Sequence, residues 1–252
     1  MHRRLDDAEL YFVTNRTTAP QRLEARFRVT GRAPAIWRAD TGQTEPASFR
    51  IEGGETIVPL DMLASESFFV VFNQPATASS RSVVKPTFVK AAEISGPWDV
   101  AFQPGRGAPA KIRLDALGSL SEQAEPGVKY FSGVATYNKT FELPKGVKPG
   151  QALLVDLGRI GDVAEVRVNG KLAGTIWKAP HRLDIGALVR PGRNHLEVRV
   201  ANLWVNRLVG DRQPGAQKVT YTTAPTYRPN APLRPSGLIG PVTLMSAQDE
   251  GR

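Results

Sequence analysis

One short segment of this chain gathers side chains of the types that bind hydroxyl-rich ligands. Trp204 lies between Asn202 and Asn206, and Arg207 and Asp211 follow within the same ten residues. An aromatic ring stacks on the apolar side of a sugar ring, while planar amides, carboxylates and guanidinium groups bridge its hydroxyls. These residue types at this spacing indicate carbohydrate binding or, equally, contact with another domain.

A second gathering lies about twenty-five residues earlier and contains Trp177, His181, Arg182 and Asp184. The same types of contact with a sugar are available here. A competing interpretation is structural, because Trp177 and Trp98 both stand in alternating contexts that fit core positions. Asp184 is expected to cap the turn or short helix that follows it.

No catalytic or metal site is predicted. His2, His181 and His195 are too sparse for a zinc site, and the chain has no cysteine. Neither a nucleophile elbow nor a phosphate-binding loop is present. Carboxylates are plentiful, but a glycosidase pair is defined by its separation in space. We therefore predict no catalytic residue, no metal ligand and no cofactor; a structural calcium ion is possible but no motif indicates it.

Short antiparallel strands must position the two gatherings. Residues 163–168 alternate apolar and polar side chains, Asn169-Gly170 suits a tight turn, and residues 172–177 resume the strand. Alternation returns in residues 196–201. The first gathering therefore follows directly on a strand end.

The whole chain is predicted to be all-β, with two β-sandwich domains of which the second is a galactose-binding-like jelly roll. Alternation and turn signals recur every ~8–12 residues, as in sandwiches. Residues 1–75 form the first domain, 76–95 a linker and first strand region, and 96–248 the jelly roll. A proline-rich stretch, 210–235, is expected to be an ordered, extended loop, and such loops are often functional.

Individual strands are expected at the positions where alternation is clearest. In the first domain these are residues 10–14, 22–29, 35–38, 48–51, 56–60 and 68–72. In the second they are residues 98–103, 134–143, 152–157, 163–168, 172–177, 182–185, 196–201 and 237–245.

Several motifs carry a resemblance to known glycoside hydrolases. VNGK, WKAPHRLDI and LVRPGRNHLEVRV, followed by the closing SGLIGPV, resemble the sugar-binding jelly roll of family 2 type enzymes. YFSGVATY and NLWVNRLVGD are similar to the C-terminal region of the alpha-L-rhamnosidases of glycoside hydrolase family 106. The N-terminal third of the chain resembles the sandwich that precedes the sugar-binding domain in those enzymes, at DDAELYFVTNR, APAIWRADTGQ and ESFFVVF. The closing motif often carries Arg where this chain has Gly240, so a ligand contact from that position is lost or moved.

The resemblance implies a function without catalysis in this chain. Those enzymes carry their catalytic carboxylates on an upstream (β/α) barrel, which needs about 250 residues of alternating strands and helices. The 252 residues of this chain are instead used in strands, turns and prolines, so no barrel fits. We expect a non-catalytic carbohydrate-binding and barrel-docking C-terminal portion of an alpha-L-rhamnosidase-like hydrolase, either truncated or separately encoded. Its expected partners are rhamnose-containing glycans and a catalytic barrel of the same or a companion chain. Two alternatives remain: a self-contained small glycoside-active enzyme, and a purely structural sandwich pair that braces a barrel.

Composition excludes other classes of partner. The formal charge is +9, but its basic residues are scattered along strands, where alternation places Arg22, Arg26 and Arg28 on a solvated face. No nucleic-acid motif accompanies them, and no apolar run is long enough for a membrane span. We predict neither nucleic-acid nor membrane binding. Absence of cysteine and of a signal peptide leaves the compartment open, while the resemblance implies a periplasmic or secreted parent enzyme.

Overall fold

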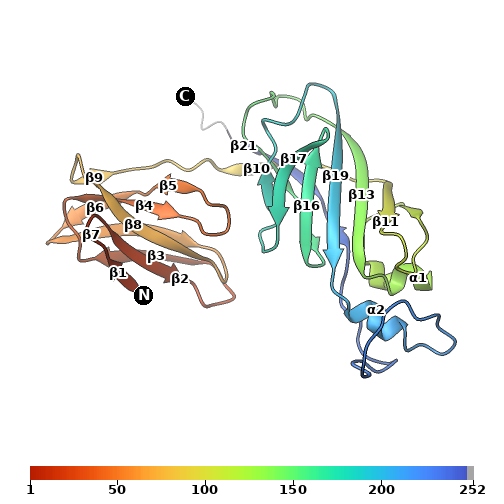
Figure 1. The fold of residues 1–252 in the computed structure, drawn as a ribbon. Coiled ribbons are helices and arrows are strands. Elements are labelled where there is room, and N and C mark those ends of the chain that lie inside the picture. The colour runs from red at the N-terminus through yellow and green to blue at the C-terminus, as the bar shows by residue number, and fades with distance from the viewer. Residues whose placement is uncertain (249–252) are drawn as a thin grey trace. The chain divides into compact units, whose positions relative to one another are not determined.

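The computed structural model describes residues 1–248 and divides the chain into two compact units, Met1–Lys85 and Pro86–Arg252. Strands make up 46% of it and helices 5%, and Figure 1 shows two separate groups of strands. The predicted all-β class with two sandwich domains is therefore confirmed. Each unit is described by itself below.

The first unit consists of two antiparallel sheets. One has the order β1 (His2–Arg4), β2 (Glu9–Thr14), β8 (Ser67–Pro75), β4 (Arg32–Trp37) and β5 (Thr44–Pro46). The other has the order β3 (Gln21–Phe27), β7 (Glu55–Met62), β6 (Phe49–Glu52) and β9 (Ser80–Arg81).

Alternate residues of the central strands form the core of this unit. Because successive side chains of a strand point to opposite faces, every second residue of β7 and β8 faces the other sheet. One buried cluster accordingly contains Val58, Leu60 and Met62 of β7 and Phe68, Val70 and Phe72 of β8. The two sheets are held together by this apolar layer.

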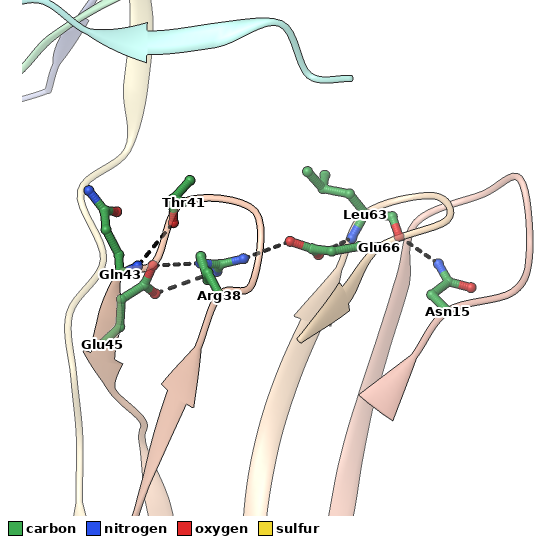
Figure 2. A network of polar contacts seen from close by, with 7 residues as sticks. All are labelled: Asn15, Arg38, Thr41, Gln43, Glu45, Leu63 and Glu66. Carbon is green, nitrogen blue, oxygen red and sulfur yellow. Dashed lines mark hydrogen bonds and ion pairs between the residues drawn. The ribbon is translucent and has the colours of Figure 1, made fainter. Parts of the chain in front are cut away.

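A polar network fixes one end of the first unit (Figure 2). The Arg38 guanidinium donates to Glu45 (Nε–Oε1 2.6 Å) and to Glu66 (Nη1–Oε1 2.8 Å). Glu66 also accepts from the backbone N–H of Leu63, whose carbonyl accepts from Asn15. Burial opposes the charge of Arg38, but the two carboxylates outweigh it and raise its pKa. Three strand connections are tied together by these contacts.

The second unit is a larger sandwich. Its six-stranded sheet has the order β12 (Lys111–Leu114), β11 (Trp98–Phe102), β13 (Gly133–Glu142), β19 (Arg193–Asn202), β16 (Val163–Val168) and β17 (Lys171–Ile176). Its four-stranded sheet has the order β10 (Phe88–Glu93), β21 (Thr243–Ala247), β14 (Leu153–Asp156) and β18 (Arg182–Asp184). β15 (Arg159–Ile160) and β20 (Leu238–Gly240) form a separate pair.

Three short helical segments complete the second unit: η1 (Leu120–Glu122), α1 (Pro126–Lys129) and α2 (Val205–Gly210). Figure 1 shows α2 directly beyond the end of β19. Residues 211–235 follow α2, and we call them the long loop. The core lies between the two sheets, where Leu196, Val198 and Val200 of β19 belong to the same buried cluster as Val155 and Leu244.

The structure differs from the expected strands where strands are short or interrupted. Strands β1, β5, β9, β12 and β15 have two to four residues each, too few for alternation to reveal them. The strand expected over 237–245 is two strands, β20 and β21, separated by Pro241, which has no N–H to donate to a ladder. β9 and β10 lie within the expected linker, 76–95, and each pairs within its own unit. We propose that the domain boundary follows the division at Lys85.

Candidate functional site

The predicted site residues come together at one end of the second unit. Ala164 pairs with both Ile176 and Val200, so the ends of β17 and β19 lie on either side of the start of β16. Gly158 bridges to Gly240 at the same end. We call residues 157–162, 177–182, 202–211 and 236–241 the loop end.

Two tryptophans at the loop end are exposed. Trp177 is 58% exposed and Trp204 is 43% exposed. The guanidinium carbon of Arg106 lies 4.7 Å from the centre of the Trp204 ring, which is a cation–π contact. Trp98, in contrast, is 1% exposed. The core interpretation therefore holds for Trp98 and is wrong for Trp177.

His181 and Arg182 make contacts that hold the chain in place beside Trp177. A ring nitrogen of His181, Nδ1, lies 2.7 Å from the carbonyl oxygen of Gly158. Arg182 donates from Nε to Asp156 Oδ2 at 2.7 Å. Asp184 accepts from the backbone N–H of Gly186, which is the expected capping contact. The side chain of Arg182 as a whole is 41% exposed.

Asn202 connects the end of β19 to the closing segment. Its Oδ1 accepts from the N–H of Gly237 at 2.6 Å, and its Nδ2 donates to the carbonyl of Gly133 at 3.2 Å. Gly237 has a φ of +82°, and a Cβ there would lie 2.2 Å from the Tyr137 hydroxyl oxygen. Only glycine fits, so the Ser-Gly of the closing motif has a steric reason.

Asn206 is directed into the chain and away from solvent. It is 2% exposed, donates to the carbonyl of Arg234 and accepts from the N–H of the same residue, both at 2.8 Å. The side-chain amide of Asn206 therefore binds both backbone groups of Arg234 and fixes the end of the long loop. Its expected direct contact with a sugar is replaced by a structural role.

Arg207 and Asp211 form a buried ion pair. Their side chains are 7% and 6% exposed, and Arg207 Nε lies 2.9 Å from Asp211 Oδ1. The N–H does not point at this oxygen, so the contact is electrostatic and is not a hydrogen bond. Asp211 also accepts from the N–H groups of Val219 and Thr220 and from the Thr220 hydroxyl. The predicted ligand contacts of both residues are corrected accordingly: each is used inside the chain.

The charge of Asp211 is stabilised despite its burial. Burial acts to raise the pKa of its carboxyl, but the hydrogen bonds from Thr220 and Val219 and the positive charge of Arg207 outweigh this effect. The resulting pKa lies below the usual value. An ionised Asp211 therefore anchors residues 219 and 220 of the long loop to α2.

Arg106 contacts Trp204 of the loop end but was not predicted as a site residue. Its neighbours Gly105 and Gly107 have φ values of +71° and +83°, and a Cβ on Gly107 would lie 3.0 Å from Arg207 Nη1. The Gly-Arg-Gly sequence was a signal of a tight turn, but only the fold brings that turn to Trp204.

Comparison with known proteins places these features in a class. Residues 1–51 match the family model of the alpha-L-rhamnosidases of glycoside hydrolase family 106. Residues 122–232 match the model described as glycosyl hydrolase 2 galactose-binding domain-like. Most of the second unit is therefore similar to the galactose-binding-like domain of glycoside hydrolases, as predicted.

Two individual proteins are similar over longer stretches. The structure of a rhamnosidase from Novosphingobium sp. PP1Y is 53% identical and matches 97% of this chain with a TM-score of 0.93. A protein of Formosa agariphila that is named as a beta-glucuronidase is 40% identical in an alignment of 176 residues that covers 60% of this chain. The predicted resemblance to family 106 rhamnosidases is thereby confirmed. The chain spans 23% of the length of the solved rhamnosidase and 15% of the Formosa protein.

Residues 1–248 contain neither a membrane-spanning helix nor a metal-binding cluster. No helix in this range is long and apolar enough to cross a membrane. The same residues contain no group of three or more His, Cys, Asp or Glu side chains arranged to hold a metal ion.

Proposed function

We propose that this chain is a non-catalytic, carbohydrate-binding portion of an alpha-L-rhamnosidase-like glycoside hydrolase. The observation that carries the proposal is the pair of exposed tryptophans, Trp177 and Trp204, at the loop end of a galactose-binding-like sandwich. Both rings are large and partly open to solvent, and a sugar ring offers an apolar face that can stack on an aromatic ring.

The polar groups around the two rings suit a hydroxyl-rich partner. Arg106 lies over Trp204, and Arg182 lies in the segment that follows Trp177. Guanidinium groups donate several hydrogen bonds from a planar fork and can bridge neighbouring sugar hydroxyls. We propose rhamnose-containing glycans as the ligand, since the chain is 53% identical to part of a rhamnosidase.

We also propose that the loop end docks on the catalytic barrel of the same or a companion chain. In this arrangement the sugar lies between the tryptophans and the barrel, so one surface performs both tasks. The purely structural alternative is favoured by one observation: Asn206, Arg207 and Asp211 are buried and bind within the chain. These residues stabilise the loop end whether it binds a sugar or only braces a barrel. The role of the two tryptophans therefore distinguishes the two proposals.

The test is calorimetric titration of the chain with L-rhamnose and with rhamnose-containing oligosaccharides. We expect Trp204→Ala and Trp177→Ala each to weaken binding by about ten-fold, because stacking on an aromatic face contributes on the order of 1 kcal/mol. Trp37→Ala is the matched control, since Trp37 is 37% exposed and lies in the first unit. If no glycan binds, sugar binding is refuted and the structural alternative is supported. If all three variants bind a glycan as tightly as the wild-type chain, the two tryptophans are refuted as the binding site.

A further inference from the structure

The long loop after α2 encloses a cavity that the proposed function does not use. Side chains between Leu208 and Tyr227 line it, and its volume is about 180 Å³. Pockets for drug-sized ligands measure ~300–1,000 Å³. This cavity is therefore of a size for one small ring, such as a single monosaccharide unit.

The walls of the cavity are fixed by hydrogen bonds within the chain. Asp211 holds Val219 and Thr220 through backbone hydrogen bonds of 3.1 and 2.8 Å. Gln213 donates from Nε2 to the carbonyl of Pro229 at 2.8 Å, which ties the two sides of the loop together. Asn206 fixes the loop's end at Arg234. A loop held in this way is preorganised, so a ligand does not have to order it on binding.

The lining combines aromatic rings and hydroxyl groups. Tyr221 is 90% exposed, and Tyr227 lies on the same cavity and is partly buried. Thr222 and Thr226 also belong to the lining. Phenol rings and hydroxyls are suited to stack on a sugar ring and to exchange hydrogen bonds with it.

The cavity also carries positive charge. Arg212 and Lys218 line it, and no acidic side chain among the described residues forms an ion pair with either of them. The one carboxylate in the lining belongs to Asp211, and the buried guanidinium of Arg207 neutralises it. A ligand with a negative charge is therefore favoured over a neutral one.

We propose that this cavity binds a single anionic sugar unit, with its carboxylate or sulfate ester on Arg212 and Lys218 and its ring against Tyr221. The inference rests on the proposed function in one respect, that the chain binds carbohydrate. It adds a second subsite, apart from the exposed tryptophans, and it assigns a charge to the sugar that the subsite accepts.

The experiment titrates the full chain at low salt with D-galacturonic acid, galactose 6-sulfate, galactose and inorganic sulfate. We expect at least one of the two anionic sugars to bind five-fold or more tightly than galactose and than inorganic sulfate. Lys218→Gln and Arg212→Gln should each weaken that binding about five-fold, since a hydrogen bond to a charged group stabilises a complex more than a neutral one. Lys171→Gln is the control, because Lys171 is exposed on β17. Thermal unfolding and circular dichroism verify that each variant is folded.

Different outcomes separate this inference from the proposed function. If galactose or inorganic sulfate binds as tightly as the anionic sugars, or if the Lys218→Gln/Arg212→Gln double variant keeps full affinity, the anionic subsite is refuted. Loss of rhamnoside binding in Trp204→Ala would then still support the proposed function. Binding of an anionic sugar that depends on Lys218 and is unchanged by Trp204→Ala supports the cavity as a separate subsite. The tryptophan site is refuted only if rhamnoside binding is also unchanged in Trp204→Ala and Trp177→Ala.

Discussion

The guanidinium of Arg207 lies 2.9 Å from the carboxylate of Asp211 across one turn of chain, and both side chains are almost completely buried. Residues of these two types, four apart and just after a strand, are equally suited to bind a sugar from solvent. Here they bind each other, and Asp211 in turn holds residues 219 and 220 of the long loop. The pair thus positions the loop that carries the proposed anionic subsite.

Replacing Arg207 by alanine should destabilise the second unit. The substitution leaves the Asp211 carboxylate buried without its partner, and breaking a buried pair costs about 3–5 kcal/mol. Urea unfolding, followed by tryptophan fluorescence, measures the change.

Arg193→Ala is the matched control, because its contact with Glu142 joins two side chains that are 79% and 67% exposed. That variant should unfold close to the wild-type urea concentration. Equal effects of the two substitutions would show that the Arg207 pair is no stronger than a surface contact.

Asp211 should make the second unit sensitive to acid. Its pKa is lowered in the folded protein, where hydrogen bonds from Thr220 and Val219 and the charge of Arg207 outweigh the opposing effect of burial. A carboxyl with a lowered pKa in the folded protein stabilises the fold, and this contribution is fully present above the pKa of the unfolded chain, about 3.9 for aspartate. That contribution is lost as the pH falls through the folded value.

Urea midpoints measured between pH 6 and pH 3 test this expectation. The wild-type chain should lose stability more steeply below about pH 4 than Asp211→Asn, which has no carboxyl to protonate at this position. Parallel curves for the two proteins would mean that protonation of Asp211 is not coupled to folding.

Gly237→Ala should be poorly tolerated. The added Cβ would lie 2.2 Å from the Tyr137 hydroxyl oxygen, and the φ of +82° is strained for any residue with a Cβ. Gly215→Ala provides the control, since Gly215 has a φ of +72° but no atom within 4 Å of the added Cβ. The control isolates the backbone strain, which is about 1–2 kcal/mol.

We expect the thermal midpoint of Gly237→Ala to fall well below that of Gly215→Ala. Combining Gly237→Ala with Tyr137→Phe should recover part of the difference, because the second substitution removes the clashing oxygen. No recovery in the double variant would place the clash elsewhere, for example on Leu120, whose Cγ lies 2.8 Å from the same added Cβ.

The chain on its own should not hydrolyse a nitrophenyl rhamnoside. Its residues are used in two β-sandwich units, whereas a (β/α) barrel of the kind that carries catalytic carboxylates needs about 250 residues. The assay compares purified wild-type chain with a mock purification. Turnover that is lost when one Asp or Glu of this chain is replaced would establish the self-contained enzyme instead.

The sequence by itself determined the class of fold, because the period of side-chain alternation is a local property of a strand. Residues 163–168 and 196–201 alternate, and they form β16 and the central part of β19. Asn169 and Gly170 have φ values of +51° and +80°, as the tight turn between β16 and β17 requires. The proline-rich stretch was likewise recognisable as a loop.

Tertiary structure alone decided which of the candidate residues face solvent. Trp98 and Trp177 stand in similar alternating contexts, yet the first belongs to the buried core of the second unit and the second is exposed. The same holds for Arg207 and Asp211, whose types suit a ligand as well as an ion pair. Burial depends on which distant segments cover a side chain, here residues 219–220 and the turn at Gly107. No pattern within residues 202–211 contains that information, because the covering segments lie elsewhere in the chain.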